Sequence, residues 1–179
     1  MRLFKVLGRD GSACHGGHGK WSLPDGDMPG EWMPRIKDPE PCERGYHLCR
    51  RGDLLNWLGP TIYEAEARGR IVVGGDKVVC EAARLLRRMN WDDRVARLFA
   101  ADCAERATKY WTAPEGVTWH PRQTIAVVRR YAVGRATDEE LAAARDAAWA
   151  ASSAAARAAA WAVEREAQTR LLVSYLEMT

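Results

Sequence analysis

The side chains that could bind a metal lie between positions 14 and 49. Cysteine sulfur and histidine nitrogen are zinc ligands, and a structural zinc site uses about four of them. The candidates are Cys14, His18, Cys42, His47 and Cys49. Their spacing matches no standard zinc knuckle, and clustered cysteines are often core or surface residues. The sequence therefore assigns no metal and no other cofactor, and a structural zinc stays as an alternative.

His47 could instead act as a general base, because it lies in a Gly-Tyr-His segment flanked by strand patterns. The order of strand, Gly-Tyr-His, short helix and second strand resembles compact ADP-ribosyltransferases. That resemblance implies that His47 or Tyr63 grips a nicotinamide dinucleotide and that Glu64 or Glu66 orients the ribose. No nucleophile elbow or phosphate loop accompanies these four residues. No catalytic residue is assigned, and a small enzyme of this kind is the alternative to a binding protein.

Residues 12–41 are rich in glycine and proline, which argues against regular structure over most of their length. A loop this long is uncommon unless its own side chains pack it down or a ligand holds it. Trp21 and Trp32 are its large apolar side chains, and Tyr46 and His47 follow it closely. Binding residues often lie in such segments, so these four are the candidates for ligand binding.

Arginines on both sides of residue 90 could follow a phosphate backbone if they shared one surface. They are Arg84, Arg87, Arg88, Arg94, Arg97 and Arg106. Acidic neighbours, including Asp92, Asp93, Asp102 and Glu105, dilute any positive field there. A solvated face with ion pairs is the simpler interpretation, and nucleic-acid binding is a second alternative to protein binding.

The first half of the chain reads as strands and turns. Strands are expected at Arg2–Leu7, Gly45–Cys49, Thr61–Ala67 and Ile71–Val73, with a turn at Arg68–Arg70 between the last two. Asp53 is expected to cap a short helix over Leu54–Leu58. Lys77–Met89 has strand character at its start and helical composition at its end, and a strand through about Ala83 is favoured.

The second half reads as helices that begin with caps and end at breakers. Asn90 is expected to cap the first helix, and Thr137 with Glu140 forms a capping box for the third. The helices are expected at about 91–111, 121–133, 138–151 and 154–177, with one continuous helix in place of the last two as the alternative. The fold class is therefore α+β. We expect a small mixed or antiparallel sheet domain over 1–89 and an all-α, alanine-rich helical bundle over 90–179.

A nine-residue unit occurs twice, as AAARDAAWA at 142–150 and AAARAAAWA at 154–162. The stretch 147–156 between the charged residues Asp146 and Arg157 is expected to be buried. Its alanines would let helices approach closely, and Trp149 and Trp161 would fill the remaining gaps.

Composition bounds the class of protein. A hydrophobic content of 47% with 28% charged residues is that of a globular chain, and the net charge of +3 is too small to indicate nucleic acid. Five cysteines are an odd set, which fits a reducing compartment better than a disulfide framework. No secretory or membrane-spanning segment is apparent. The expected location is the cytoplasm of a bacterium, or of the host if a phage encodes the protein.

Two segments resemble known families. Residues 91–106 (WDDRVARLFAADCAER), followed by 132–141, resemble the helical immunity-protein domain of bacterial toxin–immunity systems. The Gly45–Cys49 motif with Asp76–Val79 resembles an uncharacterised N-terminal domain of phage and actinobacterial proteins. The helical resemblance implies neutralisation of a toxin, nuclease or defence component by protein binding, without catalysis. A protein partner is therefore expected, a homodimer through the helical half is the alternative, and neither nucleic acid nor a membrane is expected as a partner.

Overall fold

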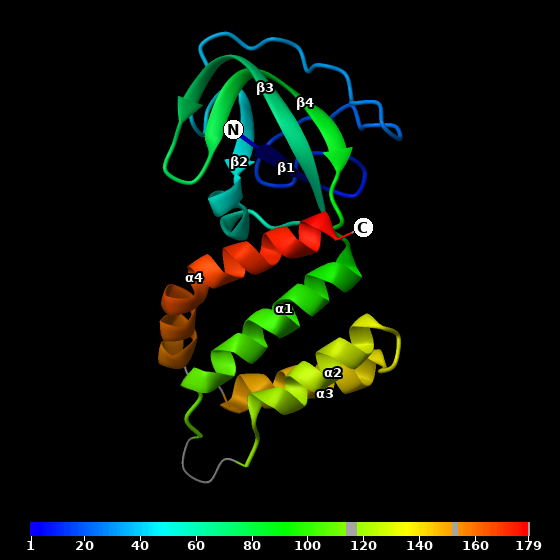
Figure 1. Cartoon of the computed structure of the whole chain (residues 1–179), viewed down its shortest axis with the longest axis vertical. Helices are drawn as coiled ribbons and strands as arrows, with labels where there is room; N and C mark the ends of the chain where they lie inside the picture. Colours follow the sequence, from blue (N-terminus) through cyan, green and yellow to red (C-terminus); the bar gives the residue numbers. More distant parts are fainter. Residues whose placement is uncertain (114–117, 152–153, 179) are drawn as a thin grey trace. The chain divides into compact units, whose positions relative to one another are not determined.

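The computed structural model describes residues 1–113, 118–151 and 154–178, and it leaves aside the side chains of 149–163. The chain forms two compact units, Met1–Asp92 with Leu176–Thr179, and Asp93–Tyr175. The first unit is built mainly of strands and the second of helices, so the chain is α+β (Figure 1). The predicted join lay near Met89, whereas the division follows Asp92 and returns the last residues to the first unit.

Four antiparallel strands close into a barrel in the order β1-β2-β4-β3. They are β1 (Leu3–Leu7), β2 (Tyr46–Arg50), β3 (Thr61–Val73) and β4 (Val78–Arg88). Side chains alternate along a strand, so Leu3 and Leu7 share the face that packs with Leu48, Val78 and Leu85 in the core. The expected sheet is thus antiparallel, and it is closed on itself.

The loop before β2 covers an edge of the barrel that β2 leaves open. β2 pairs with β4 only as far as Cys80. Further along β4, backbone N–H groups of Gly30, Met33 and Ile36 donate to the carbonyl oxygens of Leu85, Ala83 and Glu81. Trp21 anchors the same loop in the core with 5% of its surface exposed. Backbone pairing and this tryptophan therefore order a segment that holds only isolated bridges.

Two strand predictions need correction. Arg68–Arg70 is not a turn, because β3 runs unbroken from Thr61 to Val73 with an irregular register between Arg68 and Ile71. Gly69 takes φ +82° there, a conformation that glycine adopts at little cost. β4 continues to Arg88 instead of ending near Ala83, since its pairing with β3 overrides the helical composition of its last residues.

The short helix after β2 begins earlier than predicted. A 3-10 helix, η1, spans Arg51–Asn56, so Asp53 lies inside its first turn instead of capping it. The Asp53 carboxylate accepts the backbone N–H of Arg50 at 3.1 Å and pairs with the Arg50 guanidinium at 2.6 Å. Asp53 therefore does stabilise the start of a helix, but it does so from the third position inside the helix and not from the residue before it.

The second unit contains α1 (Asp93–Ala107), η2 (Thr108–Tyr110), α2 (Pro121–Ala132), α3 (Asp138–Ala151) and most of α4 (Ala154–Glu177). Thr137 and Glu140 form the expected capping box. α1 begins at Asp93, two residues later than expected, and the backbone N–H of Asn90 donates to the carbonyl oxygen of Leu176. The predicted start of this helix was therefore too early.

A buried carboxylate joins α4 to the end of α1. Glu164 is 3% exposed and pairs with Arg106, Lys109 and the hydroxyl of Tyr110. These hydrogen bonds outweigh the effect of desolvation and lower the pKa of Glu164 to about 2. Tyr175 likewise donates to Asp102 at 2.6 Å and packs edge-on against Phe99. The helical unit is therefore held by polar contacts as well as apolar ones.

The predicted burial of 147–156 and the packing of Trp149 and Trp161 lie largely outside the described residues. None of the helices in the described part of the chain combines the length and apolar character that crossing a membrane requires.

Gly30→Ala should destabilise the first unit by more than about 2 kcal/mol, because it creates a clash in a packed loop. A Cβ at Gly30 would lie 2.1 Å from the carbonyl oxygen of Ser22. Gly52→Ala is the matched control, since a Cβ there meets nothing within 4 Å. Urea unfolding of both variants measures the difference, and equal stability would contradict the described path of the loop.

Candidate functional site

The first two strands of the barrel separate partway along their length. β1 pairs with β3 at every residue from Leu3 to Leu7, but with β2 only at Leu3 and Phe4. Beyond Phe4 the side chain of Lys5 crosses the space between the strands. Its Nζ donates a hydrogen bond of 3.0 Å to the carbonyl oxygen of His47. A side chain therefore takes the place of backbone pairing at this point.

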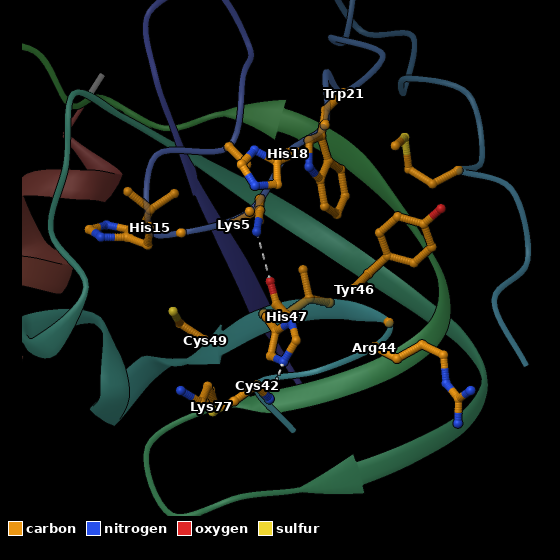
Figure 2. A pocket seen from close by; sticks show the side chains of 18 of the residues that line it. Lys5, His15, His18, Trp21, Cys42, Arg44, Tyr46, His47, Cys49 and Lys77 are labelled. Carbon is orange, nitrogen blue, oxygen red and sulfur yellow. Dashed lines mark hydrogen bonds between the residues drawn. The ribbon is translucent and has the colours of Figure 1, made fainter. Parts of the chain in front are cut away.

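A cavity of about 600 Å³ lies at this separation (Figure 2). Its walls come from β1, β2, the long loop between these two strands, and the segments around Trp57 and Lys77. The lining side chains with chemical character are Lys5, His15, His18, Trp21, Cys42, Glu43, Arg44, Tyr46, His47, Cys49, Trp57 and Lys77. This volume lies within the range of about 300–1,000 Å³ that is usual for small-molecule sites.

Lys5 is a partly buried amine on the face of β1 that also carries Leu3 and Leu7. Its Nζ lies 5.0 Å from the centre of the Trp21 ring. Burial lowers the pKa of Lys5. Among the described residues no carboxylate pairs with this amine, so a carbonyl oxygen and an aromatic face are its partners. In the described part of the chain it is therefore a partly buried charge without a counter-charge.

Trp21 and Tyr46 form the aromatic wall of the cavity. Their rings meet edge to face with centroids 5.4 Å apart. The Tyr46 hydroxyl donates to the carbonyl oxygen of Pro34 at 2.7 Å, which ties the loop to β2, and burial raises the pKa of Tyr46. Trp32, the fourth predicted binding residue, does not line this cavity and instead packs beneath the guanidinium groups of Arg68 and Arg84.

His47 holds the end of the long loop. Its Nε2 accepts the backbone N–H of Cys42 at 2.9 Å, which requires that this nitrogen carry no proton. Cys42 has φ +67°, a left-handed conformation that non-glycine residues seldom adopt. Burial lowers the pKa of His47, and the charges of Lys5 and Lys77 lower it further. The neutral imidazole is therefore the form that the folded unit favours.

Trp57 forms the other end of the cavity. Lys77 Nζ lies 4.4 Å from the centre of the Trp57 ring. The indole N–H of Trp57 donates to the carbonyl oxygen of Asp76. His15 packs edge-on against Trp57, and its Nε2 lies 2.9 Å from the carbonyl oxygen of that residue. The cavity thus presents an aromatic ring and a lysine at each end.

The structure brings together most of the predicted metal ligands without arranging them for a metal. His18, Cys42, His47 and Cys49 line the cavity, and Cys14 is absent from the lining. Within the described residues, no three His, Cys, Asp or Glu side chains are grouped as a metal site. All five cysteines are free, and burial raises the pKa of the Cys49 thiol to about 12.

The candidates for an ADP-ribosyltransferase site do not meet. His47 lines the cavity, but Tyr63 is 4% exposed within the core. Glu64 pairs with Arg2 and Arg87, and Glu66 pairs with Arg84. Neither glutamate lines the cavity. Two of the six arginines that could have formed a phosphate-binding surface, Arg84 and Arg87, are thus engaged in ion pairs.

Sequence reasoning missed Lys5, Trp57 and Lys77. A signal for Lys5 was present, because Lys5 lies at every second position with Leu3 and Leu7 and so shares their face of a predicted strand. Trp57 and Lys77 join the site through the closure of the barrel, which no local pattern indicated.

Comparison of the chain with protein-family models, with curated proteins and with solved structures finds no match.

Acid should destabilise the wild-type chain through His47. The unfolded chain takes up a proton near the ordinary pKa of 6.5, whereas folded His47 resists protonation. This contribution to stability is therefore present above that value and is lost as the pH falls below it. Urea unfolding between about pH 8 and pH 5 should show a larger loss for wild type than for His47→Gln, which keeps an acceptor but does not titrate. Parallel curves for the two proteins would contradict the prediction.

Proposed function

We propose that the protein acts by binding and that its barrel unit holds a small anionic ligand with a flat apolar part. The observation that carries this proposal is the Lys5 ammonium, which faces the cavity and has no carboxylate partner among the described residues. A buried charge is costly unless it is paired. An anion that enters the cavity would supply the missing counter-charge.

The remaining lining supports an anion over a cation. Arg44 and Lys77 add two further positive charges, and Glu43 is the one carboxylate among the described lining residues. Trp21, Tyr46 and Trp57 supply aromatic surface for the apolar part of the ligand. A carboxylate or phosphate on an aromatic or similarly flat group matches this combination of charge and surface.

Binding is favoured over catalysis because the two candidate catalytic glutamates, Glu64 and Glu66, form ion pairs with arginines. Glu64 and Glu66 are engaged by arginines on the barrel, and Tyr63 is packed in the core. His47 uses its Nε2 to hold the backbone of Cys42. The side chains proposed for an ADP-ribosyltransferase thus have other roles, and a binding protein is the better proposal.

For the helical unit we keep a separate proposal that rests on the resemblance of residues 91–106. We propose that it is a helical bundle which binds a protein partner, as an immunity-type inhibitor of a toxin, nuclease or defence component does. The polar contacts around Glu164 and Asp102 would give such a bundle a fixed shape. A cytoplasmic location, with a homodimer as the competing use of the same helices, belongs to this proposal.

Calorimetric titration with para-methylbenzoate and phenyl phosphate tests the ligand proposal. Both should bind, and uncharged para-methylbenzamide should bind at least about tenfold more weakly, because it has no charge to pair with Lys5. Equal affinity for the amide, or no affinity for either anion, would contradict the proposal.

Lys5→Met should weaken anion binding by about tenfold or more, since the buried counter-charge is lost. Lys20→Met is the matched control, because Lys20 is exposed and does not line the cavity. Circular dichroism of both variants establishes that each is folded before titration. An unchanged affinity in folded Lys5→Met would move the anion site away from this cavity.

A further inference from the structure

The amine of Lys5 differs from those of the other lysines in its surroundings. The chain has five lysines, and Lys20, Lys37 and Lys109 are exposed. Lys77 lies against an aromatic ring at the far end of the cavity and has Asp76 Oδ1 at 3.9 Å. Lys5 alone is set on the inward face of a strand, with its Nζ at the cavity and no carboxylate beside it in the described part of the chain.

We infer that Lys5 forms an imine with a carbonyl group of the ligand, so that the cavity takes up flat aldehydes or ketones that also carry an anionic group. This inference rests on the proposed anion binding, to which it adds a covalent step. It is carried by the position of the Nζ, which is enclosed by Trp21 and the parted strands and is presented to the cavity.

The chemistry needs no further reactant. The lone pair of the uncharged Lys5 amine attacks the carbonyl carbon, a C–N bond forms, and the carbonyl π electrons move to the oxygen. The oxygen then leaves as water with the two hydrogens of the amine, which gives the C=N bond of the imine. Reaction with water in the reverse direction releases the carbonyl compound unchanged.

The surroundings of Lys5 make imine formation more favourable at Lys5 than at an exposed lysine. Burial lowers the pKa of Lys5, so more of the amine is uncharged at neutral pH. No acidic side chain in the described residues holds the proton on it. When the imine is protonated it restores a positive charge beside the Trp21 ring, where the lysine charge was.

The same lining fits the second group of the ligand. An anion without a carbonyl group pairs with Lys5 itself, but when the carbonyl carbon of the ligand is joined to Lys5 its carboxylate or phosphate would pair with Lys77, which also lines the cavity. The aromatic body would lie along Tyr46 or Trp57. A carbonyl group and an anion on a flat frame are therefore the features by which the cavity would select its ligand.

Reductive trapping with para-formylbenzoate and sodium cyanoborohydride tests the inference. The reduced imine adds the mass of the aldehyde, less one water and plus two hydrogens, and peptide mapping assigns the modified residue. We expect Lys5 to be modified at least about tenfold faster than any other lysine, because the cavity holds the aldehyde against it. Excess para-methylbenzoate should protect Lys5 and leave the exposed lysines unaffected.

Lys5→Arg removes the nucleophile, since arginine forms no reducible imine. It should lose the trapped adduct, whereas Lys20→Arg, at an exposed lysine outside the cavity, should keep it. Wild-type mapping is readable even if this variant does not fold. An adduct spread evenly over the lysines, in a protein that binds para-methylbenzoate, would overturn the inference while leaving the proposed function intact. Failure of para-methylbenzoate to bind would instead remove the proposed function.

Discussion

The hydrogen bond from Lys5 Nζ to the carbonyl oxygen of His47 joins two strands where their backbones no longer pair. Without such a link, a barrel of only four strands would have an open seam between β1 and β2. A longer side chain spans more space than a backbone hydrogen bond does, so the strands remain apart and a cavity fits between them. The cost is a charge placed in low-dielectric surroundings, and this cost is what a ligand would relieve.

The rest of the first unit keeps this seam in shape. The long loop is fixed at three places, by backbone pairing of Gly30, Met33 and Ile36 with β4, by Trp21 in the core, and by His47 at Cys42. Trp21, Met33, Ile36, Cys42 and His47 from these attachments all line the cavity. The loop therefore lines the cavity without forming regular structure. The path of the loop depends on pH, because His47 accepts the N–H of Cys42 only while its imidazole is neutral.

The sequence predicted the parts of this structure that depend on residues close together in the chain, and it did not predict the parts that depend on residues far apart in the chain. β1, β2 and the Thr137–Glu140 capping box follow from local alternation and local hydrogen bonds, and all were predicted. The unbroken β3, with its irregularity around Gly69, depends on register with β4, which the sequence does not display. Likewise Trp21, Tyr46 and His47 were identified as binding residues by type, whereas Lys77 and Trp57 join them only because the barrel closes. Trp32 was chosen by the same reasoning, yet stacking with two arginines places it elsewhere.

The most direct test of this account is a titration of the Lys5 side chain by nuclear magnetic resonance, in protein labelled at lysine Cε and free of added ligand. Lys5→Arg assigns the signal, and exposed Lys20 and Lys37 serve as internal references. The account predicts that Lys5 loses its proton at a pKa below the ordinary 10.5, because it is buried without a counter-charge. A pKa at or above 10.5 would mean that an acidic group already pairs with it, and the argument for an anionic ligand would then be wrong.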